Sequence, residues 1–233
     1  EATDQKFALK RTVIKLKKAR ESIIGTIEGN FVLGKVETPL ISNFHYGHEN
    51  GITRFLTRFN DFDLENIDTL LPENLKADTI LNGKVSGIVF LMLNDKMAPT
   101  RLRVNATGNT GKIISKKLYN TTIEYDRLSL KSGYDFGRKS FAVEEFKINA
   151  GDMVVNTNLR HSYNANDNGY DITLNGEVTN VKIDELSVLW PEGLAKTPRS
   201  WVTNNLSSGD VELADINVRA KHTPNADKKK FNI

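Results

Sequence analysis

The chain has 233 residues, of which 39% are hydrophobic and 26% charged, a balance that excludes a disordered or collagen-like protein. Its 32 Lys and Arg nearly match its 29 Asp and Glu, and because the positive residues are scattered we expect no nucleic-acid partner. There is no cysteine, which excludes a disulfide scaffold and a thiolate metal site.

The longest apolar stretch, 88–93, is far shorter than the roughly eighteen residues of a spanning helix. The chain begins with Glu1 and shows no signal peptide, so we expect a piece of a longer protein. Any membrane anchor is then expected outside this stretch.

Apolar and polar residues alternate over much of the chain, which is the pattern of half-buried β-strands. Asn-Gly dipeptides supply the positive φ angles of tight hairpin turns, so we expect antiparallel meanders. The run 85–93 is apolar on both faces and predicts a central strand that is covered on both sides. The alternating runs, in chain order, are 101–106, 121–125, 146–148, 170–174 and 211–213.

A short helix is predicted near 198–206. Thr197 is a suitable N-cap, Pro198 fits the first helical position, and Gly209 follows the helix. We expect this helix to cap or plug a sheet edge.

An internal repeat relates 62–75 to 181–194 at a constant offset of 119 residues. Both segments contain Leu-x-Pro-Glu-x-Leu, and each leads through a glycine into a new strand. We therefore divide the chain into the end of a preceding β-repeat (1–61), one repeat unit (62–180) and the start of the next (181–233).

No catalytic, metal or cofactor site is indicated. The segment 106–113 has the spacing of a phosphate-binding loop, but Ile113 stands where that loop needs Ser or Thr. His45 and His48 fit no common metal spacing, and the adjacent carboxylates of 144–145 should point to opposite faces of a strand. We expect a non-enzymatic protein.

The C-terminal segment carries a family resemblance. It contains Leu-Trp-Pro at 189–191, Arg-x-Trp-Val at 199–202, and Gly209 before the next strand. These features, in this order, resemble the AsmA-like proteins of Gram-negative envelopes, specifically the YhdP type, which is related to TamB. The strand-rich run 133–176 resembles the same domain.

The resemblance implies a large periplasmic protein, anchored in the inner membrane, whose β-repeats stack into an open groove that carries phospholipid toward the outer membrane. It therefore implies a mostly β fold, a curled antiparallel sheet forming an open, taco-like groove with short helices capping or plugging it. The implied partners are phospholipid acyl chains and neighbouring repeats of the same chain.

Two interpretations remain open for the alternating apolar residues, because alternation alone favours the closed core of a β-sandwich. The alternative function is a non-catalytic structural module that binds envelope proteins along exposed strand edges. Trp190, Pro191 and Trp201 are expected to be structural anchors. The groove candidates are Leu102, Val104, Ile123, Tyr125, Phe146, Ile148, Ile172, Leu174, Leu213 and Val218.

Overall fold

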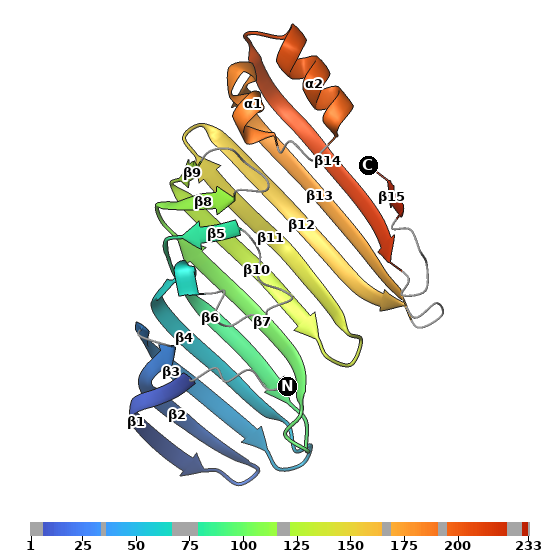
Figure 1. Cartoon of the computed structure of the whole chain (residues 1–233). Helices are drawn as coiled ribbons and strands as arrows, with labels where there is room; N and C mark the ends of the chain where they lie inside the picture. The colour runs from blue at the N-terminus through green and yellow to red at the C-terminus, as the bar shows by residue number, and fades with distance from the viewer. Residues whose placement is uncertain are drawn as a thin grey trace.

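Antiparallel β-strands make up most of the chain in the computed structural model (Figure 1). The structure describes residues 7–33, 36–66, 79–115, 122–164, 169–190, 195–222 and 230–232. Within these ranges the fold is mostly β, with two short α-helices, as the alternating pattern predicts. Pro191 lies outside the described residues.

The main sheet has 12 strands in the described part of the chain, and every neighbouring pair is antiparallel. Its order is β1-β2-β3-β4-β6-β7-β10-β11-β12-β13-β14-β15. The sheet is thus a continuous meander, which confirms the expected antiparallel arrangement, although the Asn-Gly dipeptide at 175–176 lies inside β13 and not in a turn. The strands are β1 (Phe7–Lys18), β2 (Ser22–Leu33), β3 (Val36–Gly47), β4 (Thr53–Asp63), β6 (Lys84–Leu93), β7 (Pro99–Gly108), β10 (Arg127–Asp135), β11 (Ser140–Ala150), β12 (Met153–Asn164), β13 (Gly169–Lys182), β14 (Asp210–His222) and β15 (Lys230–Asn232).

A second, three-stranded sheet has the order β5-β8-β9. Its strands are β5 (Thr79–Asn82), β8 (Gly111–Ser115) and β9 (Thr122–Tyr125). They come from the β4–β6 and β7–β10 connections, while the β13–β14 connection carries η3 (Ile183–Glu185), α1 (Leu186–Leu189) and α2 (Lys196–Asn205). All three connections leave the main sheet at the same end of the long strands, and Figure 1 shows the small sheet and α1 at that end.

One face of the main sheet is apolar across eleven strands. Because side chains alternate between faces, residues that are paired in register share a face. Two such rows define what we call the apolar face, and neither row contains Asp, Glu, Lys or Arg. The first row is Leu16, Gly25, Phe44, Phe55, Leu91, Leu102, Tyr134, Phe141, His161, Ile172 and Ala220, and the second is Ile14, Ile27, Ser42, Thr57, Val89, Val104, Ser132, Val143, Leu159, Leu174 and Val218.

The opposite face, which we call the polar face, carries charged residues on most strands. Ion pairs there join neighbouring strands, as between Lys131 and Glu145, whose Nζ and Oε2 atoms are 2.7 Å apart. Such exposed pairs add little stability. Their charges are hydrated, which makes this face suited to contact with water. One row of this face is Lys15, Thr26, Asn43, Leu56, Phe90, Arg103, Gly133, Ala142, Arg160, Thr173 and Arg219.

Strand β6 corresponds to the doubly apolar run 85–93 and lies between β4 and β7. Its polar-face residues Phe90 and Met92 are half-buried. Phe90 is in register with Arg103, and Met92 with Arg54 and Arg101. The aliphatic stems of neighbouring arginines are well suited to shield such residues while their charges stay in water.

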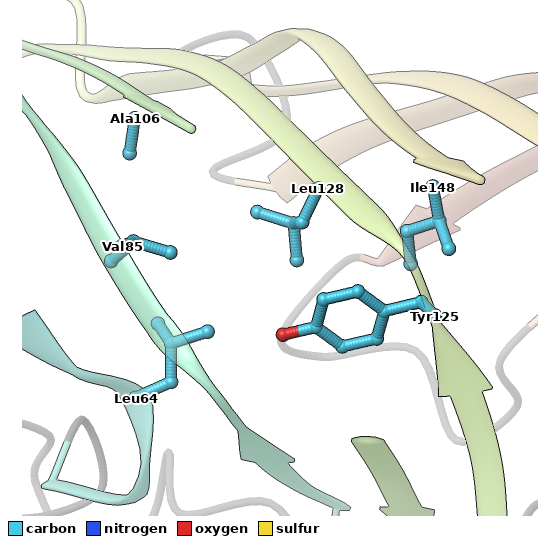
Figure 2. Close-up of a cluster of buried hydrophobic side chains, with 6 residues drawn as sticks. All are labelled: Leu64, Val85, Ala106, Tyr125, Leu128 and Ile148. Carbon is cyan, nitrogen blue, oxygen red and sulfur yellow. The ribbon is translucent and has the colours of Figure 1, made fainter. Parts of the chain in front are cut away.

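The most deeply buried cluster lies where the small sheet meets the apolar face (Figure 2). Tyr125 of β9 is 1% exposed, and its hydroxyl donates a hydrogen bond of 2.9 Å to the Asn82 carbonyl oxygen. This contact joins β9 to β5. The cluster consists of Leu64, Val85, Ala106, Tyr125, Leu128 and Ile148.

The 119-residue repeat has a matching local geometry in the structure. Strand β4 ends at Asp63 and strand β13 at Lys182, and each is followed by a three-residue 3-10 turn. The Leu64 amide donates to the Gly83 carbonyl oxygen, and the Ile183 amide donates to that of Gly209, each at 2.9 Å. The two corners are therefore built alike, which supports the alignment, while the boundaries of the repeat units stay predictions.

The residues before and after these two corners also correspond. Asp61 and Asn180, which are 119 residues apart, have φ angles of 53° and 58°. Gly83 and Gly209 have φ angles of 138° and 126°, a region that side chains rarely allow. Because both segments place the same backbone conformations at corresponding positions, chance is a poor explanation for the match between the two sequences.

The C-terminal helix begins earlier than predicted, at Lys196 rather than near 198. No side chain caps it, and the residue before it, Ala195, is left-handed with φ of 46°. Pro198 is accommodated because the amides of a first helical turn have no partner within the helix. Arg199 joins α2 to α1, donating to the carbonyl oxygens of Trp190 at 2.9 Å and Ser187 at 2.7 Å.

Candidate functional site

Seven of the ten predicted groove residues lie together on the apolar face. The register places Leu102, Tyr134, Phe141, His161 and Ile172 in one row across neighbouring strands. Val104, Leu174 and Val218 share the second row in the same way. The seven are Leu102, Val104, Phe146, Ile148, Ile172, Leu174 and Val218.

Leu213 lies on the opposite face. It is in register with Thr179, which is paired with Val154, and its side chain is 55% exposed. The reason is visible in the sequence, since Leu213 and Val218 are five residues apart on one strand and an odd separation reverses the face. Checking this parity removes Leu213 from the candidates.

Ile123 and Tyr125 belong to the small sheet rather than the main one. Tyr125 and Ile148 are only 1% and 4% exposed, and both belong to the buried cluster of Figure 2. Burial raises the pKa of the Tyr125 hydroxyl. For these two residues the structure agrees with a closed core. The accessible candidates lie nearer the opposite end of the strands, which has the turns at 94–98 and 136–139 and which we call the hairpin end.

Aromatic residues that were not among the candidates also occupy the apolar face. Phe44 and Phe55 lie in the first row with ring centroids 5.9 Å apart, and Tyr134 and Phe141 continue it. Phe141 is 37% exposed. The alternation of apolar and polar residues in 36–47 and 53–63 is the sequence pattern that identifies Phe44 and Phe55.

Exposure of the apolar face is greatest in β1. Leu16 and Ile14, which begin the two rows, are 65% and 59% exposed. Together the eleven strands of a row span about 48 Å at roughly 4.8 Å per strand. An apolar surface of this length is unusual for a protein face that contacts only water.

A hollow of about 380 Å³ lies near the connections, between the small sheet and α1. Its apolar lining includes Ile123, Met153, Val188 and Leu189. Ile123 is thus the one small-sheet candidate that lines an accessible space. Glu185 brings a carboxylate to the same hollow.

His45, His48 and the carboxylates of 144–145 all lie in the described part of the chain. No group of three or more His, Asp or Glu is placed to hold a metal ion there. His161 lies on the apolar face and stacks on Tyr170 at 4.7 Å between ring centroids. The side chain of His222 lies outside the described residues.

Two other sequence motifs also have structural explanations, although a register shift between Val143 and Phe146 interrupts the regular alternation that the prediction for 144–145 assumed. Strand β8 begins at Gly111, so the glycine-rich segment connects β7 to a strand rather than to a phosphate-binding helix. Glu145 accepts hydrogen bonds from Lys131 at 2.7 Å and Ser129 at 2.9 Å. These bonds, that of Lys131 above all, hold the pKa of Glu145 below its ordinary value of 4.5.

The expected anchor residues differ in burial. Trp190 is half-buried, and its carbonyl oxygen accepts the hydrogen bond from Arg199. Trp201 is 60% exposed, so it is not an internal anchor of this segment. No described helix is long and apolar enough to cross a membrane.

Comparison with known proteins gives no family model, no curated protein and no solved structure that matches this chain.

Proposed function

We propose that this segment binds phospholipid acyl chains on its apolar face and conducts them along the rows, perpendicular to the strands. The observation that carries the proposal is the unbroken run of uncharged residues across eleven strands. From the resemblance of the C-terminal segment to AsmA-like proteins of the YhdP type, we further propose that this activity takes place in the periplasm, between inner and outer membrane. In that setting the sheet curls around its cargo as an open groove.

Energetics support an apolar row as a path for acyl chains. Each methylene moved from water to an apolar surface gains about 0.8 kcal/mol, so a long chain is held firmly. Dispersion and the hydrophobic effect have no preferred direction, and neighbouring positions such as Leu102 and Ile172 offer the chain equivalent surroundings. An acyl chain therefore moves along the row without breaking a strong directional bond.

The polar face supports the same orientation of the sheet. Glu145, Lys131 and their equivalents on other strands keep that face hydrated, so only one face is suited to lipid. At the connection end, the buried cluster around Tyr125 and Leu128 closes the apolar face over a few strands. The conducting surface is then the part nearer the hairpins, where Phe141 is 37% exposed.

Site-specific photo-crosslinking tests which face of the sheet binds acyl chains. A photo-reactive phenylalanine at Phe141 is expected to capture acyl chains in cells, while the same residue at Lys147, exposed on the opposite face of β11, is not. Mass spectrometry of the adducts identifies the lipid. Equal capture at both positions, or none at Phe141 in folded protein, contradicts the proposal.

A paired substitution tests conduction. Leu174→Asp places a charge on the apolar face of β13, and Thr173→Asp places it on the polar face one residue away. We expect the first to abolish lipid transfer between donor and acceptor vesicles by the full-length protein, and the second to retain it. Circular dichroism checks that both variants are folded, and equal transfer by both contradicts a path along this face.

The alternative function is a structural or protein-interaction module of the cell envelope. It is favoured by the long edge strand β1, whose Leu9 and Val13 are 52% and 51% exposed. An exposed edge is a template for strand addition by a protein partner. Stable capture of one envelope protein by lipid-free material, lost when Val13 is replaced by Pro, favours this alternative.

A further inference from the structure

A second hollow, of about 750 Å³, lies over strands β7, β10, β11 and β12 near the hairpin end. We call it the arginine hollow because Arg101, Arg103, Arg138 and Arg160 line it. The register places the side chains of Arg103 and Arg160 on the polar face, opposite the proposed lipid path. The lining also includes residues of the two apolar rows, namely Leu102, Tyr134, Phe141, Val143 and His161.

The floor of the arginine hollow is made of small residues. Arg103 is in register with Gly133, Gly133 with Ala142, and Ala142 with Arg160. Two arginines therefore flank two positions whose side chains are no longer than a methyl group. Their strands are three spacings apart, which is about 14 Å, so an anion between them is within reach of both side chains.

The charges of the arginine hollow are not balanced. Its carboxylates are Asp135 and Glu144, against four arginines, so the lining has two more positive than negative charges. Asp135 is already engaged, since its Oδ2 lies 3.9 Å from Arg101 Nη2 and its Oδ1 accepts the Arg138 amide at 2.9 Å.

The guanidinium groups of Arg103, Arg138 and Arg160 are the free ones. None of the three has a hydrogen bond or ion-pair partner in the described part of the chain. Asp135 and Glu144 offset only part of the positive charge of the lining, so a bound anion is attracted to the remainder. Three free guanidinium groups beside the small residues Gly133 and Ala142 thus offer hydrogen-bond donors to an anion.

We propose that the arginine hollow binds a phosphate group, as a monoester or diester. Planar guanidinium groups present paired donors that match the oxygens of phosphate, and they keep their charge at any physiological pH. The same chemistry is offered by a soluble phosphate ester and by the headgroup of an anionic phospholipid. The site is on the opposite face from the acyl-chain surface, so it stands or fails independently of that function.

The test uses two probes on the purified chain, sn-glycerol 3-phosphate by calorimetry and vesicles of phosphatidylglycerol in phosphatidylcholine by sedimentation. The variant is the double substitution Arg103→Gln and Arg160→Gln. The matched control is Arg58→Gln with Arg127→Gln, which removes the same charge from exposed positions of the polar face outside the hollow. Circular dichroism verifies that both variants are folded.

We expect the double variant to bind about tenfold more weakly or worse, and the control to change by less than about twofold. Loss with the soluble ester identifies a small-molecule site, and loss with vesicles alone identifies a headgroup site. A third variant, Ala142→Leu, keeps every charge but fills the floor, and it should weaken binding as well. If neither probe binds the wild type, or if the control loses as much affinity as the double variant, the proposal is wrong.

Discussion

Tyr125 makes a single polar contact inside an apolar cluster, a hydrogen bond that joins β9 to β5 within the small sheet. Tyr125→Phe removes the hydrogen bond to the carbonyl oxygen of the half-buried Asn82, so we expect a loss of about 1 kcal/mol in the free energy of unfolding. Ile148→Ala in the same cluster should cost about 2 to 5 kcal/mol. Urea denaturation measures both, with Tyr134→Phe as the control. An equal loss in the control refutes a special role for the Tyr125 hydroxyl.

Glu145 makes the stability of the folded chain depend on pH, and the direction of this dependence follows from its lowered pKa. Its pKa is lowered in the folded chain, chiefly by the hydrogen bond from Lys131, so its contribution to stability is present above pH 4.5. That contribution is lost as the pH falls through the lower, folded pKa. The difference in melting temperature between wild type and Glu145→Gln should therefore shrink on acidification below 4.5. Glu144→Gln is the adjacent control, and a difference that grows at low pH contradicts the assignment.

The two repeat corners make a testable element, because each places a glycine at a φ angle that other residues avoid. A Cβ at Gly83 would lie 2.6 Å from the Tyr125 hydroxyl, and one at Gly209 would lie 3.1 Å from Ile183 Cδ1. Gly83→Ala should cost more than about 2 kcal/mol, and Gly209→Ala somewhat less. Gly151→Ala is the control, with φ of 57° and open space, at about 1 kcal/mol. Chemical denaturation ranks the three, and an unchanged Gly83→Ala excludes the clash.

Elements differ in how far the sequence determines them. Alternation identifies strands such as β7 and β13, and the 119-residue offset predicts that the corners at 63–64 and 182–183 correspond. The small sheet is not predictable in this way, because its strands are short and β5 pairs with β8, which belongs to a different connection of the main sheet. The helix boundary at Lys196 is missed because a left-handed Ala195, which no cap residue signals, precedes it.

The candidate surface is also only partly predictable from the sequence. Alternation along one strand is a local pattern, whereas the pairing of distant strands is not. Parity along one strand is sufficient to place Leu102 with Val104, or to separate Leu213 from Val218. Which strands are neighbours, and therefore which aromatic residues join the row, depends on the order of the sheet. Tyr125 and Ile148 look like surface candidates in the sequence because nothing local reveals that β9 covers β11.

At the scale of the whole molecule, the exposed start of the apolar face predicts self-association. Leu16 is 65% exposed at the β1 edge of the apolar rows, so two copies should associate at high concentration by covering this surface. Leu16→Lys is expected to lower association in sedimentation velocity without loss of folded structure. Val13→Lys adds the same charge on the opposite face of β1 and should have little effect. If both variants dissociate the protein equally, strand-edge pairing is responsible instead.

The placement of the β4–β6, β7–β10 and β13–β14 connections at one end of the strands also determines how this sheet can change its length. A hairpin that turns at the other end, such as β10 with β11, adds two strands, returns the chain to the side it left, and preserves which residues face which way. Duplication or deletion of one hairpin therefore alters the span of both faces by about 10 Å and disturbs neither corner. The sheet can therefore become longer or shorter in evolution by whole hairpins.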